Sequence, residues 1–217
     1  MTSSALGLVG VLGDVHAEDV RLAMALDVFA KRKVGQILCV GDIADGEGDL
    51  ERTIRLLRES GAVCVTGNHD RWWLDGTNRD VLGAQDAAAA GADARAWLTG
   101  LPTMARFDSP RGRLLLCHGL GKDDMAQVRP DDVGPALDHN TALQVLLEDR
   151  DVDIVVNGHS HRRMLRRVGR LVILNAGTLH RAYPGGFVVA DLGAGQVDLY
   201  DFDDDGPQLG RTLAWPG

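Results

Sequence analysis

The sequence predicts an α/β protein built around a parallel β-sheet, and two patterns support this prediction. In the first third of the chain, three short apolar runs alternate with two amphipathic stretches, the strand–helix order of a parallel sheet with covered faces. After residue 154, apolar runs separated by glycine-rich turns indicate a β-rich region. The length of 217 residues and the apolar content of 45% suit one globular domain, expected to span residues 1–217.

The first five elements follow from apolar spacing and from the residues that end each run. Leu6–Leu12, Gln36–Val40 and Ala62–Thr66 are apolar runs, each followed by glycine, and are expected to be buried strands. Asp19–Lys33 has apolar residues at helical spacing and a basic end, as an amphipathic helix should. Asp49–Ser60 repeats this pattern and precedes a glycine suited to a helix C-cap.

The rest of the chain is predicted from the same signals. Helices are expected at Gln85–Ala90, Ala92–Thr99 and Asn140–Asp149, and strands at Leu114–Cys117, Ile154–Asn157, Met164–Val168, Leu171–Asn175, Phe187–Leu192 and Gln196–Tyr200. The polar stretches Arg71–Gly83 and Gly121–Pro135 are expected to be irregular.

The formal net charge of −8 limits the kinds of partner. An extended nucleic-acid surface is not expected, because phosphate backbones require clustered lysine and arginine. The only dense basic stretch holds Arg162, Arg163, Arg166, Arg167 and Arg170. It is explained either by alternating exposure along a strand or by an interface for phosphate or another subunit. A small anionic substrate stays compatible with the acidic balance, since bound metals would invert the local charge.

The cysteines and the apolar runs indicate a cytoplasmic protein without a membrane partner. Cys39, Cys64 and Cys117 each lie singly inside an apolar run, which favours buried thiols over a disulfide framework. No signal peptide is recognisable, and no apolar run is long enough for a membrane span.

Five short polar blocks follow strand-like runs and carry most of the functional information. They are Asp14-Val15-His16, Gly41-Asp42, Gly67-Asn68-His69-Asp70, His118-Gly119 and Gly158-His159-Ser160-His161. Their Asp, Asn and His side chains form a ligand set suited to divalent metals. Taken alone, Asp14, Asp42 or Asn68 is better explained as a turn or cap residue, and His118 as a half-buried histidine. All five together, at strand ends across most of the chain, indicate one site assembled by folding.

In this arrangement the sequence resembles the calcineurin-like metallophosphoesterases. Their signature of D-x-H, G-D-x-x-D, G-N-H-[DE], H and G-H-x-H matches the five blocks from about Gly13 to His161, with Asp45 as the second aspartate of the second motif. The later segment Leu174–Thr178 resembles the Asn-Pro-Gly-Ser segment of small bacterial phosphodiesterase-type members. The resemblance implies a four-layer α/β/β/α sandwich of two mixed sheets flanked by helices.

The resemblance also implies which residues hold two divalent metal ions. Asp14, His16 and His161 would hold the first metal, Asn68, His118 and His159 the second, and Asp42 would bridge both. A carboxylate suits the bridging position because it has two oxygens. Manganese is the expected metal, with iron, zinc and nickel as alternatives that accept the same ligands.

The implied activity is hydrolysis of a small phosphate ester, either a phosphodiester or a phosphomonoester. A metal-bridging hydroxide would attack the phosphorus, and His69 would protonate the leaving oxygen. Asp70 is expected to hold the His69 imidazole in the right tautomer. Asp45 is expected to orient a metal ligand.

Two departures and two alternatives bear on this interpretation. Gly46 stands where Ser/Thr protein phosphatases carry arginine, and Asp70 replaces glutamate. Both changes favour the small phosphoesterase branch over protein phosphatases and diadenosine-tetraphosphate hydrolases. One alternative is a non-catalytic interaction module, because a retromer subunit shares this fold but has lost the catalytic histidine. The other is a nuclease. The retained His69 counts against the first, and the acidic balance against the second.

Four further residues have two explanations each. Trp72 and Trp73 either pack their loop against the core or stack on a substrate ring. His180 and Arg181 either reach the phosphate or lie on an exposed loop. The sequence does not decide between these, and it leaves the oligomeric state open.

Overall fold

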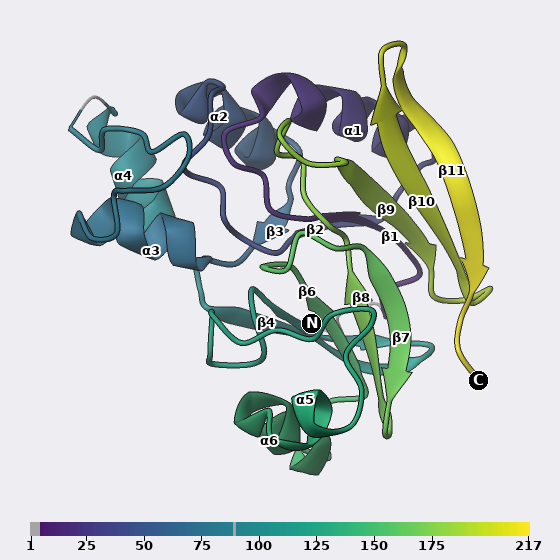
Figure 1. Ribbon diagram of the computed structural model, residues 1–217. Helices are drawn as coiled ribbons and strands as arrows, with labels where there is room; N and C mark the ends of the chain where they lie inside the picture. Colours follow the sequence, from purple (N-terminus) through teal and green to yellow (C-terminus); the bar gives the residue numbers. More distant parts are fainter. Residues whose placement is uncertain (1–4, 89) are drawn as a thin grey trace.

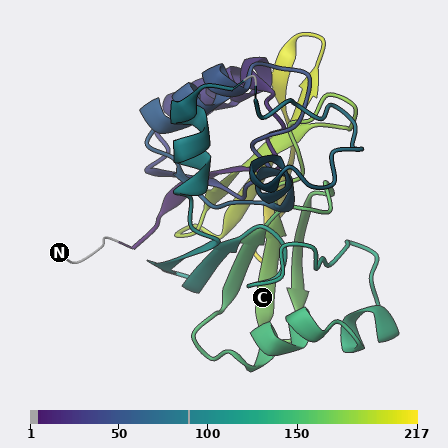
Figure 2. The ribbon, with the colours of Figure 1, turned by 90° about the vertical axis from the view of Figure 1, so that its left-hand side faces the viewer.

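Two mixed β-sheets pack face to face in the computed structural model, which describes residues 5–88 and 90–217 (Figure 1). The first sheet has the strand order β11-β10-β9-β1-β2-β3, and the second has the order β4-β5-β6-β8-β7. Helices α1 to α4 lie on the first sheet's side, and α5 and α6 cover the second sheet on the opposite side (Figure 2). The predicted four-layer α/β/β/α sandwich is therefore confirmed.

The elements have the following bounds. The first sheet contains β1 (Leu8–Leu12), β2 (Gln36–Cys39), β3 (Val63–Cys64), β9 (Gly186–Asp191), β10 (Gln196–Asp203) and β11 (Gly206–Ala214). The second contains β4 (Met104–Ser109), β5 (Gly112–Cys117), β6 (Ile154–Asn157), β7 (Met164–Val168) and β8 (Leu171–Asn175). The helices are α1 (Asp19–Lys31), α2 (Leu50–Glu59), α3 (Asn68–Asp75), α4 (Ala92–Thr99), α5 (Pro135–Asp138) and α6 (Thr141–Glu148).

Parallel strands lie at the centre of each sheet. Strands β1, β2 and β3 run parallel to one another, and so do β5, β6 and β8. The carboxyl ends of parallel strands meet at one edge of a sheet, where α/β folds place their sites. A backbone hydrogen bond of 2.9 Å from Gly158 to His118 joins the loops after β6 and β5 at this edge.

Three layers of apolar side chains separate the four layers of secondary structure. Leu114 and Leu116 of β5 face the first sheet, while Leu115 between them faces α6, as the two-residue period of a strand requires. On the other side, Phe29 of α1 packs closely over β1. A Cβ on Gly10 would lie 2.8 Å from its ring, so the absence of a side chain there allows this contact.

The predicted helices α2 and α6 begin at side-chain caps. Asp49 accepts a hydrogen bond from the Arg52 amide at 2.8 Å, and Asn140 accepts one from the Leu143 amide at 3.0 Å. Each cap satisfies an amide that the first turn of a helix leaves without a partner.

The helix expected at Gln85–Ala90 is wrong. The described residues of this segment form turns and bends, and Ala89 lies outside the described residues. The Gln85 amide donates to the Asp45 carboxylate at 3.1 Å, and the Gln85 carbonyl accepts from Arg79 at 2.9 Å. These tertiary contacts override the helix propensity of the alanines.

Four elements were not expected from the sequence, namely helices α3 and α5 and strands β4 and β11. Helix α3 begins inside the Gly-Asn-His-Asp block and occupies part of the stretch expected to be irregular. Strands β4 and β11 lie at sheet edges, each paired on one side only. The acidic residues Asp204 and Asp205 form the turn between β10 and β11.

Membrane insertion through a helix is not indicated. Within residues 5–88 and 90–217, every helix is too short or too polar to cross a bilayer.

Candidate metal centre

The loops after five strands bring all seven predicted metal ligands to one edge of the molecule. Asp14 and His16 follow β1, Asp42 follows β2, and Asn68 begins α3 directly after β3. From the second sheet, His118 follows β5, and His159 and His161 follow β6. The site is therefore assembled from both sheets.

The first group of donors consists of Asp14, His16, Asp42 and His161. One donor atom from each of the four lies within 4.8 Å of the other three. The two histidine Nε2 atoms are 3.2 Å apart, and Nε2 of His161 lies 3.0 Å from Oδ2 of Asp14. This buried Oδ2 has no hydrogen-bond partner among the described residues. A buried carboxylate oxygen facing imidazole nitrogens fits a divalent cation.

The second group lies directly beside the first. Oδ1 of Asn68 is 2.9 Å from Nε2 of His118 and 2.9 Å from Nδ1 of His159. Nε2 of His118 is also 3.4 Å from Oδ2 of Asp42, and the same oxygen lies 3.9 Å from Nε2 of His16. Asp42 therefore stands between the two groups, in the position of a shared ligand.

Two histidines have their proton positions fixed by backbone carbonyls. Nδ1 of His16 lies 2.8 Å from the Asp45 carbonyl oxygen, and Nδ1 of His118 lies 3.0 Å from the Val40 carbonyl oxygen. A carbonyl can only accept, so Nδ1 must donate, and the lone pair of a neutral imidazole is left on Nε2. Asp45 thus orients a ligand, as expected, but through its backbone.

Each aspartate divides its two oxygens between a backbone amide and the donor groups. Oδ1 of Asp14 accepts from the His159 amide at 3.1 Å, and Oδ1 of Asp42 accepts from the His69 amide at 2.8 Å. These two short contacts leave no room for a side chain at the nearby positions 158 and 67, which are both glycine. A Cβ on Gly158 would lie 2.1 Å from Oδ1 of Asp14, and one on Gly67 would lie 2.2 Å from Oδ1 of Asp42.

Backbone strain is concentrated at the same edge. Among the described residues, eight non-glycine residues have positive φ, and five of them belong to this site: His16, Asp42, Asp45, His159 and His161. Each such conformation costs about 1 kcal/mol or more, and clusters of them mark functional sites. Here the amides of Val15 and His16 both donate to the Asp42 carbonyl, at 2.9 and 2.8 Å, which helps to hold the two loops.

The electrostatics of the site favour a positive charge at its centre. Burial lowers the pKa of His16 to about 4, which keeps its imidazole neutral and able to bind a cation. Burial also disfavours charge on His118, but the carboxylates of Asp42 and Asp14 outweigh this effect and raise its pKa to about 10. Despite their burial, Asp14 and Asp42 have lowered pKa values because histidines surround them. Two ionised carboxylates therefore face one small volume.

His69 lies beside the donor groups and has a carboxylate partner. Its Nδ1 is 2.9 Å from Oδ2 of Asp45. The same carboxylate accepts two hydrogen bonds from the Arg79 guanidinium, at 3.0 Å on Oδ2 and at 2.5 Å on Oδ1. The sequence analysis missed Arg79, which no motif marks.

The prediction that Asp70 orients His69 is wrong. The Asp70 carboxylate instead accepts from the amides of Ile43 and Ala44, both at 2.8 Å, and from the amide of Gly67 at 2.9 Å. It thereby ties the loop that carries Asp42 to the start of α3. Burial, reinforced by the charge of Asp42, raises the pKa of Asp70 to about 7.

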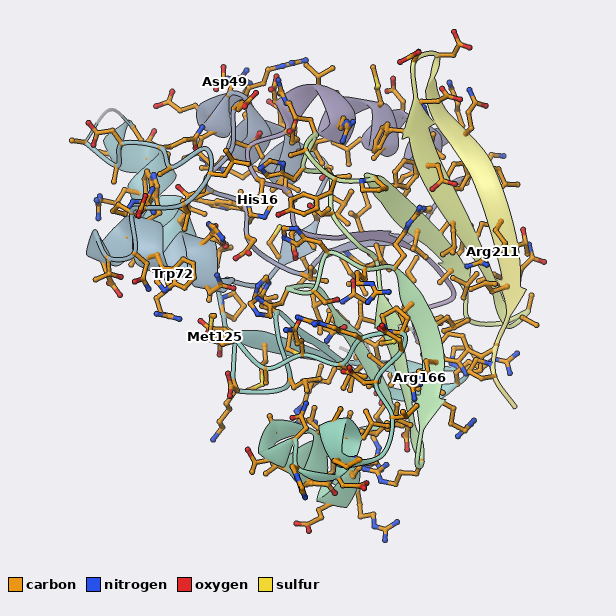
Figure 3. The ribbon with its side chains drawn as sticks, viewed as in Figure 1. His16, Asp49, Trp72, Met125, Arg166 and Arg211 are labelled. Carbon is orange, nitrogen blue, oxygen red and sulfur yellow. The ribbon has the colours of Figure 1, made fainter. Side chains whose placement is uncertain are left out.

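The structure separates the two tryptophans. Trp73 is fully buried in the core beneath α3, whereas Trp72 is half-buried with its ring centroid 5.0 Å from that of His69 (Figure 3). Core packing therefore explains Trp73, and Trp72 alone is placed to meet a ligand.

The segment after β8 also reaches the site. The ring of His180 lies 5.1 Å from that of His16, but the guanidinium of Arg181 is held by Glu18 at 2.9 Å. Tyr183, which the sequence analysis did not single out, packs edge-on against His161 with a centroid distance of 4.7 Å.

Comparison with known proteins agrees with this geometry. A model of the calcineurin-like phosphoesterase superfamily domain matches residues 8–195. No curated protein matches the sequence.

Several solved structures share the fold at low sequence identity. The phosphoesterase YfcE from E. coli has a TM-score of 0.58 at 14% identity, with 96% of this chain and 100% of that chain covered. A metallophosphoesterase from Sphaerobacter thermophilus has a TM-score of 0.68 at 18% identity, with 91% and 88% covered. Wild-type Vps29 from Entamoeba histolytica, complexed with zinc, has a TM-score of 0.56 at 21% identity, with 95% and 98% covered.

Proposed function

The chain belongs to the calcineurin-like phosphoesterase superfamily, and from this premise we propose that it is a dinuclear metal-dependent hydrolase of small phosphate esters. The observation that carries the proposal is the position of Asp42. Its Oδ2 lies within 4 Å of a histidine from each of two adjacent donor groups. A single carboxylate between two sets of ligands is the arrangement that a pair of metal ions requires.

Asp14, His16 and His161 would hold one ion, Asn68, His118 and His159 the other, and Asp42 both. Two bound ions would neutralise the phosphate oxygens and make water a stronger nucleophile near neutral pH. Manganese is the proposed metal. Zinc is a ligand in the similar Vps29 structure, and a mixed Asp, Asn and His set accepts either ion.

The proposed proton donor to the leaving oxygen is His69. Burial lowers the pKa of this histidine, but the hydrogen bond to Asp45 and the charges of Asp42 and Asp45 outweigh burial and raise it. A raised pKa favours the protonated imidazole, the form that a general acid needs. Arg79 donates to both oxygens of the Asp45 carboxylate and so fixes the orientation of the pair.

The glycine at position 46 favours the small phosphoesterase branch of the superfamily over the protein phosphatases. A Cβ at this position would lie 1.8 Å from the His16 carbonyl oxygen, so the backbone here excludes any side chain. The arginine that protein phosphatases carry at this point has no place in this chain.

The first experiment is turnover of a chromogenic phosphodiester and of the matching monoester, before and after chelation, with manganese then added back. We expect activity to disappear on chelation, to return with manganese, and to accompany two metal ions per chain by elemental analysis. Asp42→Asn should lower the content of both ions, whereas Asp93→Asn on the exposed surface of α4 should change neither.

If neither ester is hydrolysed although two ions are bound, a hydrolase of broad specificity would be contradicted. That result would leave an enzyme of narrow specificity or a non-catalytic interaction module. Full activity in the chelated protein would exclude the metal-dependent reaction itself.

A further inference from the structure

A second hollow opens beside the metal centre, at the edge where the two sheets meet. It encloses about 560 Å³ and is lined by residues that include Ser160, His161, Arg162, Arg163, Tyr183 and Arg211. His161 belongs both to this pocket and to the first group of metal ligands. The pocket therefore adjoins the candidate metal centre. Its volume is within the range of small-molecule sites.

Three arginines reach this pocket from two different elements. Arg162 and Arg163 directly precede β7, the edge strand of the second sheet. Arg211 lies on β11, the edge strand of the first sheet, opposite Leu199 of β10. Figure 1 shows β7 beside the β10–β11 hairpin, and Figure 3 labels Arg211 on that hairpin. Folding thus brings Arg162 and Arg163 together with Arg211, almost fifty positions later in the chain, around one cationic pocket.

The three guanidinium groups are not fully neutralised. Arg162 pairs with Asp131 at 2.7 Å, and Arg163 pairs with Asp201. Arg211 makes no ion pair within residues 5–88 and 90–217. Both carboxylates are at least half exposed, so these pairs are weak and can be exchanged for a stronger anionic ligand. The pocket has a net positive charge in a chain whose overall charge is −8.

Arg163 forms a fixed base for the pocket. Its Nη1 donates to the Tyr200 carbonyl at 2.7 Å, and its side chain is only 18% exposed. Two glycines make room for it: a Cβ on Gly177 or on Gly186 would lie 2.6 Å from its side chain. Arg162 and Arg211 are exposed above this base, so their guanidinium groups are free to meet a ligand.

Tyr183 lines the pocket beside His161, on the side of the candidate metal centre. Its ring stands edge-on to His161, yet the residue is 45% exposed. A phosphate ester bound at the metals would therefore extend past an aromatic surface before it reaches the arginines. Guanidinium groups suit phosphate at that point because they donate two parallel hydrogen bonds to its oxygens.

We propose that this pocket binds a second phosphate group of the substrate, on the part of the molecule that extends from the scissile phosphorus past Tyr183. The substrate class would then be phosphate esters that carry two separated phosphates on one organic body, as nucleoside bisphosphates do. The inference rests on the proposed function, because the first phosphate is taken to bind at the metal centre. Phosphate recognition is carried chiefly by Arg211, which pairs with no carboxylate in the described part of the chain, with Arg162 beside it.

Equilibrium binding tests this assignment without requiring turnover. Thymidine 5′-monophosphate and thymidine 3′,5′-bisphosphate would be titrated calorimetrically into the manganese-loaded protein. We expect the bisphosphate to bind about tenfold more tightly or better, the gain of one charge-assisted contact. Arg211→Ala should remove most of that difference and leave the affinity for the monophosphate unchanged. Arg211→Lys should restore part of it, since lysine keeps the charge but loses the bidentate geometry.

The matched control is Arg167→Ala. Arg167 is also exposed on the same edge of the second sheet, but it lies outside the pocket and contacts only carbonyl groups. Equal affinity of the wild-type protein for the two nucleotides would overturn the proposal. An equal loss in Arg167→Ala and Arg211→Ala would also overturn it, because general charge would then explain the effect.

The chromogenic assay separates this inference from the proposed function. Metal-dependent turnover of a simple ester with no preference for the bisphosphate would keep the hydrolase and remove the second phosphate site. A bisphosphate preference lost in Arg211→Ala, without turnover of any ester, would keep the site and remove the hydrolase.

Discussion

At the scale of single residues, each carboxylate of the site has a distinct task set by what its oxygens contact. Asp14 and Asp42 give one oxygen to a backbone amide and one to the donor groups. Asp45 faces His69 and Arg79, and Asp70 faces three backbone amides. The same residue type is therefore placed as a predicted metal ligand, as the partner of His69 and as a structural acceptor.

His69 and Asp45 should act as one unit. We expect His69→Ala to lower turnover about 100-fold or more, the usual contribution of a general acid, with nearly unchanged metal content. Asp45→Asn should also lower turnover, because the amide no longer stabilises a protonated imidazole. Steady-state kinetics of the double variant should show little further loss, since residues that act together are not additive. Full activity in His69→Ala would remove this histidine as the proton donor.

Asp70 should act on stability rather than on the proton transfer. Asp70→Ala leaves three buried amides without their acceptor, which should cost at least about 2 kcal/mol of unfolding free energy. Urea unfolding of the metal-free protein measures this directly. The variant should also bind metal more weakly, because the loop with Asp42 is no longer tied to α3. Unchanged stability with lost turnover would restore Asp70 as a catalytic partner.

The residues that the sequence could predict are those for which a short local pattern exists. Each predicted ligand follows an apolar strand and stands within two positions of a glycine or of a second predicted ligand, so a local pattern marks all seven. The contact between His69 and Asp45 spans 24 positions, and Arg79 reaches the same carboxylate from 34 positions away. No local pattern encodes contacts between residues so far apart in the sequence. The sequence therefore favours the adjacent Asp70, rather than Asp45, as the partner of His69.

At the scale of the elements, buried strands and amphipathic helices were predictable, whereas the edge strands β4 and β11 and the short helices α3 and α5 were not. The first three strands and two helices have the expected order because their apolar spacing reports burial. Strand β11 carries Pro207, Gly210 and mostly exposed side chains, so it shows no alternation to recognise. Helix α3 begins at Asn68, and its polar start resembles a loop.

An ion pair connects the end of the first helix to β10. Arg32, directly after α1, donates to Asp198 of β10 at 2.8 Å and to the Tyr200 hydroxyl at 2.7 Å. Burial raises the pKa of Asp198, but hydrogen bonds from Thr212, Arg32 and Gln196 outweigh it, and the net pKa lies below the ordinary 3.8. A lowered folded pKa stabilises the protein above pH 3.8, and this contribution is lost as the pH falls through the folded value.

Arg32→Ala should therefore destabilise the protein in a pH-dependent way. We expect a loss of about 1 kcal/mol at neutral pH, because Arg32 is partly exposed, and a smaller loss near pH 3. Denaturant unfolding at the two pH values measures the difference. Arg55→Ala on the exposed face of α2 is the control and should show no such pH dependence. An equal loss at both pH values would mean that Arg32 acts by packing alone.

At the scale of the whole molecule, the metal centre is a junction between the two sheets. Asp14, His16, Asp42 and Asn68 follow strands of the first sheet, whereas His118, His159 and His161 follow strands of the second. Ions bound to both sets would resist separation of the sheets, in addition to the apolar layer between them. In the unfolded chain these side chains would come together only by chance. Metal should therefore bind the folded state in preference to the unfolded one.

Metal should consequently raise the melting temperature in a concentration-dependent manner. A free ion at 100 times its dissociation constant stabilises the folded state by about 2.7 kcal/mol per site. Thermal unfolding over a manganese titration should show this increment in the wild-type protein. The Asp42→Asn variant should lose most of this metal-dependent stabilisation, because Asp42 faces both donor groups. The Asp14→Asn variant should lose only the part that comes from the ion in the first donor group. If two ions bind and the melting temperature stays constant, the ions cannot bridge the sheets, and the shared position of Asp42 would need another explanation.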